Sequence, residues 1–233
     1  MKNVLVFLLL VSALPCYSQL GTWNILNMKL EFNEKFSVFG EAQLRSLRPY
    51  DDFHYYEIKG GITYTFKNKF AITAGGGTYN TFLEGGNFVK PALNEEFRSW
   101  LQFIMKQSFG RTGIEHRYRA EQRFTSDGYR NRFRYRLGAT IPLNKSVIEK
   151  GTLYASVWNE IFLTNRAPFF ERNRVFGGFG YEINSNTAVQ MGYLYQYDYQ
   201  LTDETGRDFL QVSILFSIDT KHKPVHMLPG TID

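Results

Sequence analysis

Arginine recurs at every second or fourth position along two neighbouring stretches of this 233-residue chain. The first stretch, 114–124, alternates charged residues with mostly apolar or aromatic ones, and the second, 130–136, carries arginine at each even position. A planar guanidinium pairs with a carboxylate or phosphate through two parallel hydrogen bonds. Two roles are therefore open: a positive surface that selects anions, or a set of Arg–Glu pairs that braces the structure.

These arginines act together only if one kind of element places them on one face. Alternate side chains of a β-strand point to the same side, so strands would gather them on the inner wall of a barrel. By this parity the residues expected to line the lumen are Glu41, Glu57, Glu115, Arg117, Arg119, Glu121, Arg123, Arg130, Arg132, Arg134, Arg136, Glu160, Arg172 and Arg174. Cations exceed anions in this set, which favours a porin-like channel for small anionic solutes. The alternative is a structural or partner-binding barrel whose lumen is closed by Arg–Glu pairs.

A lipid-modifying enzyme is the remote alternative. Before the C-terminal tail, His54 and His116 are the available bases, and parity places both on the lipid-facing side. Ser99 lies on the segment before His116, but pairing across the 108–111 turn separates the two side chains by ~13 Å, beyond the ~3 Å that a nucleophile and its base require. The sequence therefore predicts no enzyme and no catalytic residue.

Two other sequence patterns resemble ligand-binding motifs but lack the features that such motifs require. Glycine clusters at 60–61, 75–77 and 177–180 precede no helix, so they are not phosphate loops, and glycines inside strands more often mark bulges or curvature. The acidic segment 203–208 lacks the spacing of a calcium loop and is typical of a solvated turn. We therefore expect no cofactor and no metal site.

The elements that would position these residues are long segments of alternating polarity, and nothing reads as a helix. They lie at 20–32, 36–47, 53–66, 70–81, 94–107, 112–124, 130–143, 152–163, 170–182, 187–199 and 207–218. Each is long enough to cross a bilayer at a tilt, and tight turns alternate with longer loops. The pattern predicts an all-β fold, a single closed antiparallel transmembrane barrel with short periplasmic turns and longer extracellular loops. Because single-chain bacterial barrels have an even number of strands, we expect about 12, with 10 as the alternative.

Composition favours a membrane barrel over a soluble lipocalin-like one. The chain holds 21 Phe, 15 Tyr and 3 Trp, which could supply aromatic girdles at both membrane interfaces. Its 27 Lys+Arg and 22 Asp+Glu are dispersed among aromatic residues, which argues against nucleic-acid binding.

The N-terminus reads as a secretory signal peptide. Lys2 precedes an apolar run over 4–11, and small residues lead to a cleavage site after Ser18. A lipoprotein anchored at Cys16 is the less favoured alternative, because a proline stands before it.

The expected organisation is therefore a signal peptide at 1–18, a barrel at 19–218 and a tail at 219–233. Its expected location is the outer membrane of a Gram-negative bacterium, with outer-membrane lipid and the barrel-assembly machinery as partners.

Six short motifs spread along the chain support this reading: LGTW at 20–23, FGEAQ at 39–43, HRYR at 116–119, NRFRYRL at 131–137, WNEIF at 158–162 and FERNR at 170–174. As a set they resemble an outer-membrane β-barrel family of unknown function common in Bacteroidota, the domain of unknown function 2490 family. The resemblance covers nearly the whole mature chain. It implies a barrel in the outer membrane, and it brings no substrate or catalytic residue. The tail after Ile218 departs from the usual barrel end, where an aromatic residue closes the last strand.

Overall fold

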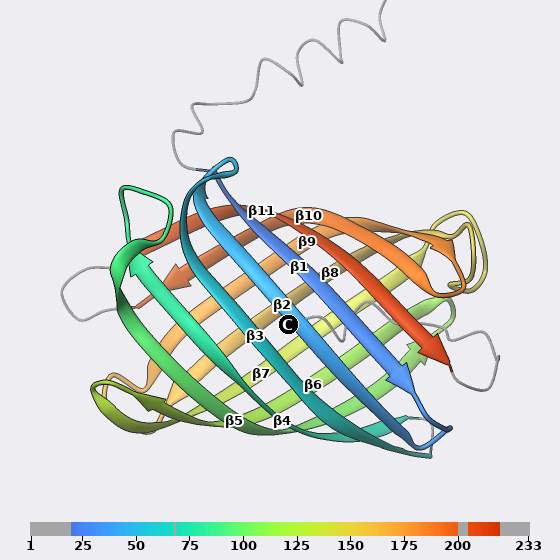
Figure 1. The fold of residues 1–233 in the computed structure, drawn as a ribbon. Coiled ribbons are helices and arrows are strands. Elements are labelled where there is room, and N and C mark those ends of the chain that lie inside the picture. The colour runs from blue at the N-terminus through green and yellow to red at the C-terminus, as the bar shows by residue number, and fades with distance from the viewer. Residues whose placement is uncertain (1–19, 68, 200–204, 220–233) are drawn as a thin grey trace, which may run out of the picture.

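The computed structural model describes residues 20–67, 69–199 and 205–219, so the expected signal peptide and nearly all of the tail lie outside the described residues. Within these ranges, eleven strands form one closed barrel (Figure 1). They are β1 (Leu20–Glu31), β2 (Phe36–Arg48), β3 (Asp51–Phe66), β4 (Phe70–Leu83), β5 (Val89–Phe109), β6 (Thr112–Thr125), β7 (Gly128–Pro142), β8 (Leu153–Thr164), β9 (Phe170–Asn184), β10 (Thr187–Asp198) and β11 (Thr205–Asp219). No helix of the described chain is long and apolar enough to cross a membrane.

The predicted closed all-β barrel is confirmed, and each alternating segment corresponds to one strand. The described strands number eleven, one below the even number expected. The 82–93 connector holds no further strand in this structure, because β5 extends back to Val89 and forms a hairpin with β4.

The barrel closes through a parallel pair. Every other neighbouring pair is antiparallel, whereas β1 runs parallel to β11, from Leu20 opposite Asp208 to Glu31 opposite Asp219. The two arrows point the same way in Figure 1. A chain that crosses a wall an odd number of times ends in the direction in which it began, so its two edge strands can pair only in parallel. As a result β1 begins at one rim of the barrel and β11 ends at the other.

The connections define these rims. We call the end where β1 begins the loop rim; it carries the connections 49–50, 84–88, 126–127 and 165–169, together with the end of β10 and the start of β11. The opposite end, the turn rim, carries 32–35, 110–111, 143–152 and 185–186, together with the end of β3 and the start of β4. The short turns expected from the sequence lie at the turn rim, where 143–152 is the long exception. The longer loops expected at the other rim are only partly present, because 49–50 and 126–127 each have two residues.

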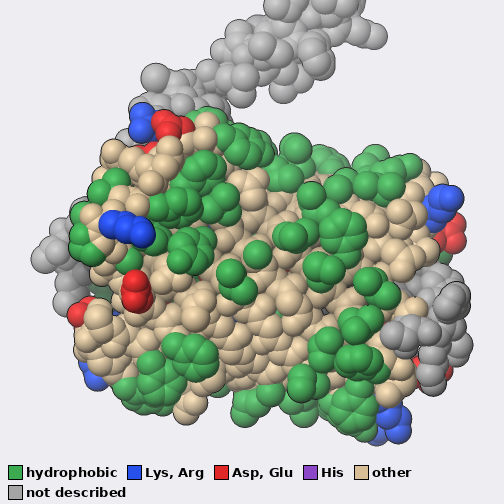
Figure 2. All heavy atoms as spheres, in the orientation of Figure 1, with side chains coloured by type: hydrophobic (Ala, Val, Ile, Leu, Met, Phe, Trp, Pro, Cys, Tyr) green, Lys and Arg blue, Asp and Glu red, His purple; other side chains and the backbone are tan. Residues whose placement is uncertain are grey.

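Alternation along each strand gives the barrel an apolar outside. Tyr118, Phe133 and Leu137, from β6 and β7, are exposed on the outer face. Figure 2 shows hydrophobic side chains spread over the strands, with charged ones gathered toward the two ends. Polar side chains at the alternate positions point inward.

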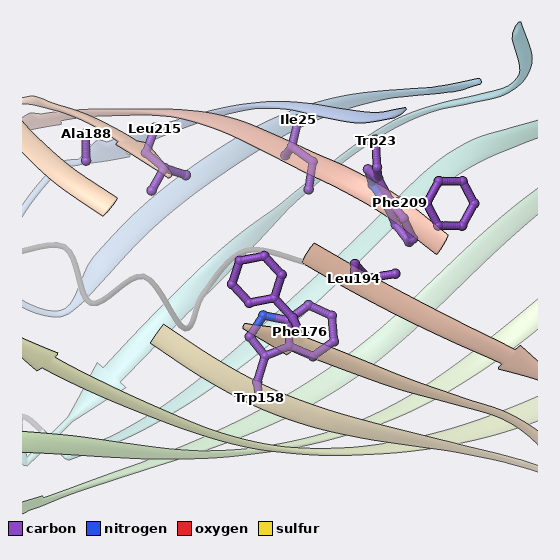
Figure 3. Close-up of a cluster of buried hydrophobic side chains, with 8 residues drawn as sticks. All are labelled: Trp23, Ile25, Trp158, Phe176, Ala188, Leu194, Phe209 and Leu215. Atoms are coloured by element: carbon purple, nitrogen blue, oxygen red, sulfur yellow. The ribbon is translucent and has the colours of Figure 1, made fainter. Parts of the chain in front are cut away.

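Part of the interior is apolar as well. A cluster from β1, β8, β9, β10 and β11 is centred on Trp23, Trp158 and Phe176, and Figure 3 shows Trp158 and Phe176 pointing toward the β1 side chains. Phe176 fits because Gly178 and Gly192 lie opposite each other beneath its ring. A Cβ at Gly178 would lie 2.8 Å from that ring and 2.7 Å from the Gly192 Cα. These glycines make room for a ring; they lie at no register shift.

Candidate functional site

Two glutamates hold a network of arginines at the centre of the lumen. Glu160 on β8 accepts hydrogen bonds from Arg117 at 2.6 Å and from Arg134 at 2.9 Å. Glu121 on β6 pairs with Arg132 at 2.6 Å and with Arg134 at 2.8 Å. Arg134 therefore bridges the two carboxylates. We call these five residues the central network.

Strand register explains how this network forms. Glu121 lies directly opposite Arg132 in the pairing of β6 with β7. The same register also places Arg117 opposite Arg136, a pairing of like charges that would be unfavourable alone. Each of the two reaches a carboxylate instead: Arg117 binds Glu160 on β8, and Arg136 lies 3.5 Å from Glu115.

The side chains of the central network are buried. Glu160 is 0% exposed, Arg117 and Glu121 are each 1% exposed, and Arg132 is 2% exposed. Side chains that line a water-filled pore keep part of their surface in contact with that water. Removing one partner of such a pair leaves a buried charge uncompensated, at a cost of about 3–5 kcal/mol.

A second set of ion pairs lines the opposite wall. Lys59 on β3 lies 2.7 Å from Glu41 and 2.6 Å from Glu57, and Arg45 on β2 lies 3.1 Å from Glu57. Asn27 of β1 donates to Glu41 at 2.6 Å. The acidic residues of this wall are therefore engaged by cations and an amide of the neighbouring strands β1, β2 and β3.

Arginines and aromatic rings meet between the two walls. The guanidinium carbon of Arg45 lies 3.4 Å from the centre of the Trp23 ring, and that of Arg174 lies 4.7 Å from the same ring. Arg174 also lies 4.7 Å from the ring of Phe162. Cation–π contacts such as these are stronger where water is excluded. They join β2 and β1 to β8 and β9 across the lumen.

Above the central network, a cavity of about 650 Å³ opens toward the loop rim. We call it the vestibule. Its lining runs from Glu84 and Arg207 at the rim down to Trp23 and Arg134. Among the described residues, nine arginines and five carboxylates line it, so its charge is positive. This volume is within the range of ~300–1,000 Å³ that is typical of small-ligand sites.

Two β-bulges change which residues reach the vestibule. His54 is the extra residue between the pairs Arg45–Tyr55 and Ser46–Phe53. It is 7% exposed and lines the cavity, so its predicted placement on the lipid-facing side is wrong. Strict alternation cannot anticipate a bulge, and this one turns two consecutive residues, His54 and Tyr55, inward.

Glu171 is the second case. It is the extra residue where Phe162 pairs with Arg172 and Leu163 with Phe170. Its carboxylate lies 3.1 Å from Arg123 and 3.2 Å from Arg132. Simple alternation from Arg172 would have placed it outside, and it was missed for that reason.

Of the fourteen residues expected to line the lumen, twelve are buried, and the other two, Arg130 and Arg172, line the vestibule. Three glutamines that accept hydrogen bonds from lumen residues were not singled out from the sequence, although they lie at inward-facing positions of the same alternation. Gln43 accepts from Trp23 Nε1 at 2.8 Å, Gln102 accepts from Arg119 at 2.6 Å, and Gln196 accepts from Arg174 at 2.9 Å.

The residues weighed for catalysis lie apart. His116 is on the outer face, with Nδ1 2.9 Å from the Tyr135 hydroxyl. Ser99 donates to Gln122 at 3.0 Å and lies opposite it in the register, six positions from His116 along β6. At ~3.4 Å per residue that separation is far beyond nucleophile–base contact. In the described ranges, no three His, Cys, Asp or Glu side chains gather as metal ligands.

Comparison with known families gives one match. The family model described as "Protein of unknown function (DUF2490)" matches residues 20–207, from the start of β1 to the start of β11. No curated protein and no solved structure matches the chain significantly.

Proposed function

This chain belongs to the DUF2490 family of proteins of unknown function, and we propose that it is an outer-membrane β-barrel with a lumen closed by Arg–Glu pairs. On this proposal it binds a ligand or partner at its loop rim, and it neither conducts solutes nor catalyses a reaction. Its insertion would require the barrel-assembly machinery, as for other barrels of that membrane.

The observation that carries the proposal is the burial of the central network. Glu160 and Glu121 are at most 1% exposed although each carries a charge. An open channel would leave such residues in water, where charged rings select ions. Of the two main functions that the sequence leaves open, this burial favours the closed barrel.

The outer face supports insertion into a bilayer. Aromatic side chains pair near the turn rim, as in Phe36 with Tyr64. Others pair near the loop rim, as in Phe97 with Phe124 and Phe124 with Tyr129. Two aromatic belts around an apolar band are typical of membrane barrels.

An anion channel is the second candidate, because nine arginines face five carboxylates in the vestibule. In that case the central network would have to open for each passing ion. Breaking its multiple charge-assisted hydrogen bonds in a buried site opposes this.

The test combines location with permeability. The protein expressed with its own leader should fractionate with outer membranes and migrate faster on gels when it is not heated. Liposomes containing the purified barrel should swell in small sugars or in sodium gluconate no faster than empty liposomes. Recovery as a soluble periplasmic protein would overturn the membrane proposal, and swelling that depends on the barrel would overturn the closed lumen.

A further inference from the structure

The vestibule holds more positive charge than its own carboxylates neutralise. All five carboxylates that line it already form ion pairs with arginines of the same cavity. Arg132 and Arg134 also pair with Glu121 and Glu160 of the central network. Among the described residues, Arg130 and Arg174 are therefore the arginines of the cavity that no carboxylate matches. A buried guanidinium without a counter-charge is costly, so its position needs an explanation.

Arg174 is the clearest such residue. It is 5% exposed, and its Nε donates to Gln196 at 2.9 Å. Within the described chain, no carboxylate oxygen lies within 4.0 Å of it and its two terminal nitrogens form no hydrogen bond. The rings of Trp23 and Phe162 hold its guanidinium in place at 4.7 Å each. Its remaining donors are thus fixed at the wall of the vestibule.

Other arginines converge on the same place. Arg45 of β2 and Arg174 of β9 lie over the same Trp23 ring, at 3.4 Å and 4.7 Å. Arg172 and Arg174 both lie over the Phe162 ring, at 5.8 Å and 4.7 Å. Arg45 lies over the Trp23 ring, and its Nε is buried without a hydrogen-bond partner. Three guanidinium groups thus approach one another in a cavity, with donors left over on two of them. An anion there would satisfy the donors and relieve the repulsion.

We propose that the vestibule is an oxyanion site in which Arg174, Arg45 and Arg172 bind a phosphate or carboxylate group of a small ligand beside Trp23. Arginine forks suit both groups, since each offers oxygens for two parallel hydrogen bonds. The inference rests on the proposed function, because a lumen closed below the vestibule retains a ligand there. The oxyanion can belong to a free solute or to a lipid headgroup that enters from the loop rim.

Calorimetry on the mature barrel, refolded in dodecyl maltoside at low salt, tests the site. Inorganic phosphate is one probe, and dihexanoyl phosphatidic acid carries the same group on a lipid. We expect saturable binding of at least one probe, weakened tenfold or more by Arg174→Gln and by Arg45→Gln. The matched control is Arg207→Gln, which removes an arginine from the same cavity but one that is paired with Glu84 at the rim. It should change affinity less than twofold.

Folding of each variant is checked by heat-modifiable gel migration. If Arg174→Gln does not fold, Arg174→Lys, which keeps the charge and loses the fork, should still weaken binding severalfold. Binding of the lipid probe alone assigns the site to a headgroup, and binding of phosphate assigns it to a free solute.

No binding of either probe, or equal losses in the Arg174, Arg45 and Arg207 variants, would overturn the proposal. Permeability is measured on the same preparation, so the two proposals fail separately. A conducting barrel that still binds phosphate through Arg174 would contradict only the closed lumen.

Discussion

Glu171 on β9 accepts a hydrogen bond from Arg123 on β6 at 3.1 Å, although two strands lie between them. The bulge opposite Leu163 makes the contact possible, because it turns Glu171 into the lumen. Arg132 of β7 binds the same carboxylate at 3.2 Å. One acidic side chain thus joins three strands, and the lumen is braced across its width as well as between adjacent strands.

Loss of a central carboxylate should destabilise the barrel strongly. Glu160→Gln leaves Arg117 and Arg134 without their shared counter-charge, and we expect the free energy of unfolding to fall by about 3–5 kcal/mol. Urea unfolding of the refolded barrel measures this. The control is Glu149→Gln, which breaks an exposed ion pair with Lys145 and should cost less than about 1 kcal/mol. Equal effects of the two changes would mean that the central network does not stabilise the barrel.

The space that Gly178 and Gly192 leave for the Phe176 ring predicts that stability is sensitive to an added methyl group there. Gly178→Ala places a methyl group 2.7 Å from the Gly192 Cα and 2.8 Å from the Phe176 ring, so the variant should lose about 1–3 kcal/mol. Gly40→Ala, where no atom lies within 4 Å of the added Cβ, is the control and should be nearly neutral. Thermal or urea unfolding compares them. A neutral Gly178→Ala would show that both the Phe176 ring and the β10 backbone, whose Met191 carbonyl oxygen lies closest to the added Cβ, can shift to make room.

Placing a charged side chain on the outer face tests whether that face contacts lipid. Leu137 is 43% exposed on β7, and Leu137→Arg should cost about 2–4 kcal/mol in lipid if it lies near the bilayer midplane. Leu143→Arg, just beyond the end of β7 at the turn rim, should cost clearly less. Unfolding in lipid vesicles gives both values. If Leu137→Arg is tolerated while Arg134→Leu is not, Leu137 does not face lipid.

Parallel closure predicts where the strand ends lie. Because β1 begins at the loop rim and β11 ends at the turn rim, an epitope placed just before Leu20 and one placed after Asp219 should lie on opposite sides of the membrane. Antibody labelling of intact and permeabilised cells distinguishes them, with an epitope in the 143–152 connection marking the turn rim. Labelling of both strand-end epitopes on the same side would contradict an odd number of strands.

The period-two pattern of the sequence predicted the strands because side-chain direction in an extended chain is a local property. The alternation at 114–124 and 130–136 therefore predicted that their seven arginines share one face, and six of the seven are buried. Parity failed at His54 and Glu171, where a bulge inserts one residue and the face changes. A bulge depends on the partner strand, and the local sequence carries no sign of it.

The strand number and the state of the lumen depend on contacts between distant residues. Pairing of β1 with β11 joins residues 188 positions apart, as in Leu20 with Asp208, and no local pattern indicates whether two edges meet in parallel. Counting charges on one face likewise showed an excess of arginine. It could not show that Arg117 reaches past β7 to Glu160, which decides whether those charges face water or each other.

Single-channel recording in planar bilayers tests the closed lumen most directly. The wild-type barrel should give no steady current in 1 M KCl, whereas replacing Arg117, Arg134 and Glu160 together by serine should open a path and produce stepwise currents. This triple variant also shows that insertion succeeded. Steady currents with anion preference from the wild type, weakened or reversed by Arg119→Glu/Arg134→Glu, would contradict the closed lumen and establish an anion channel instead.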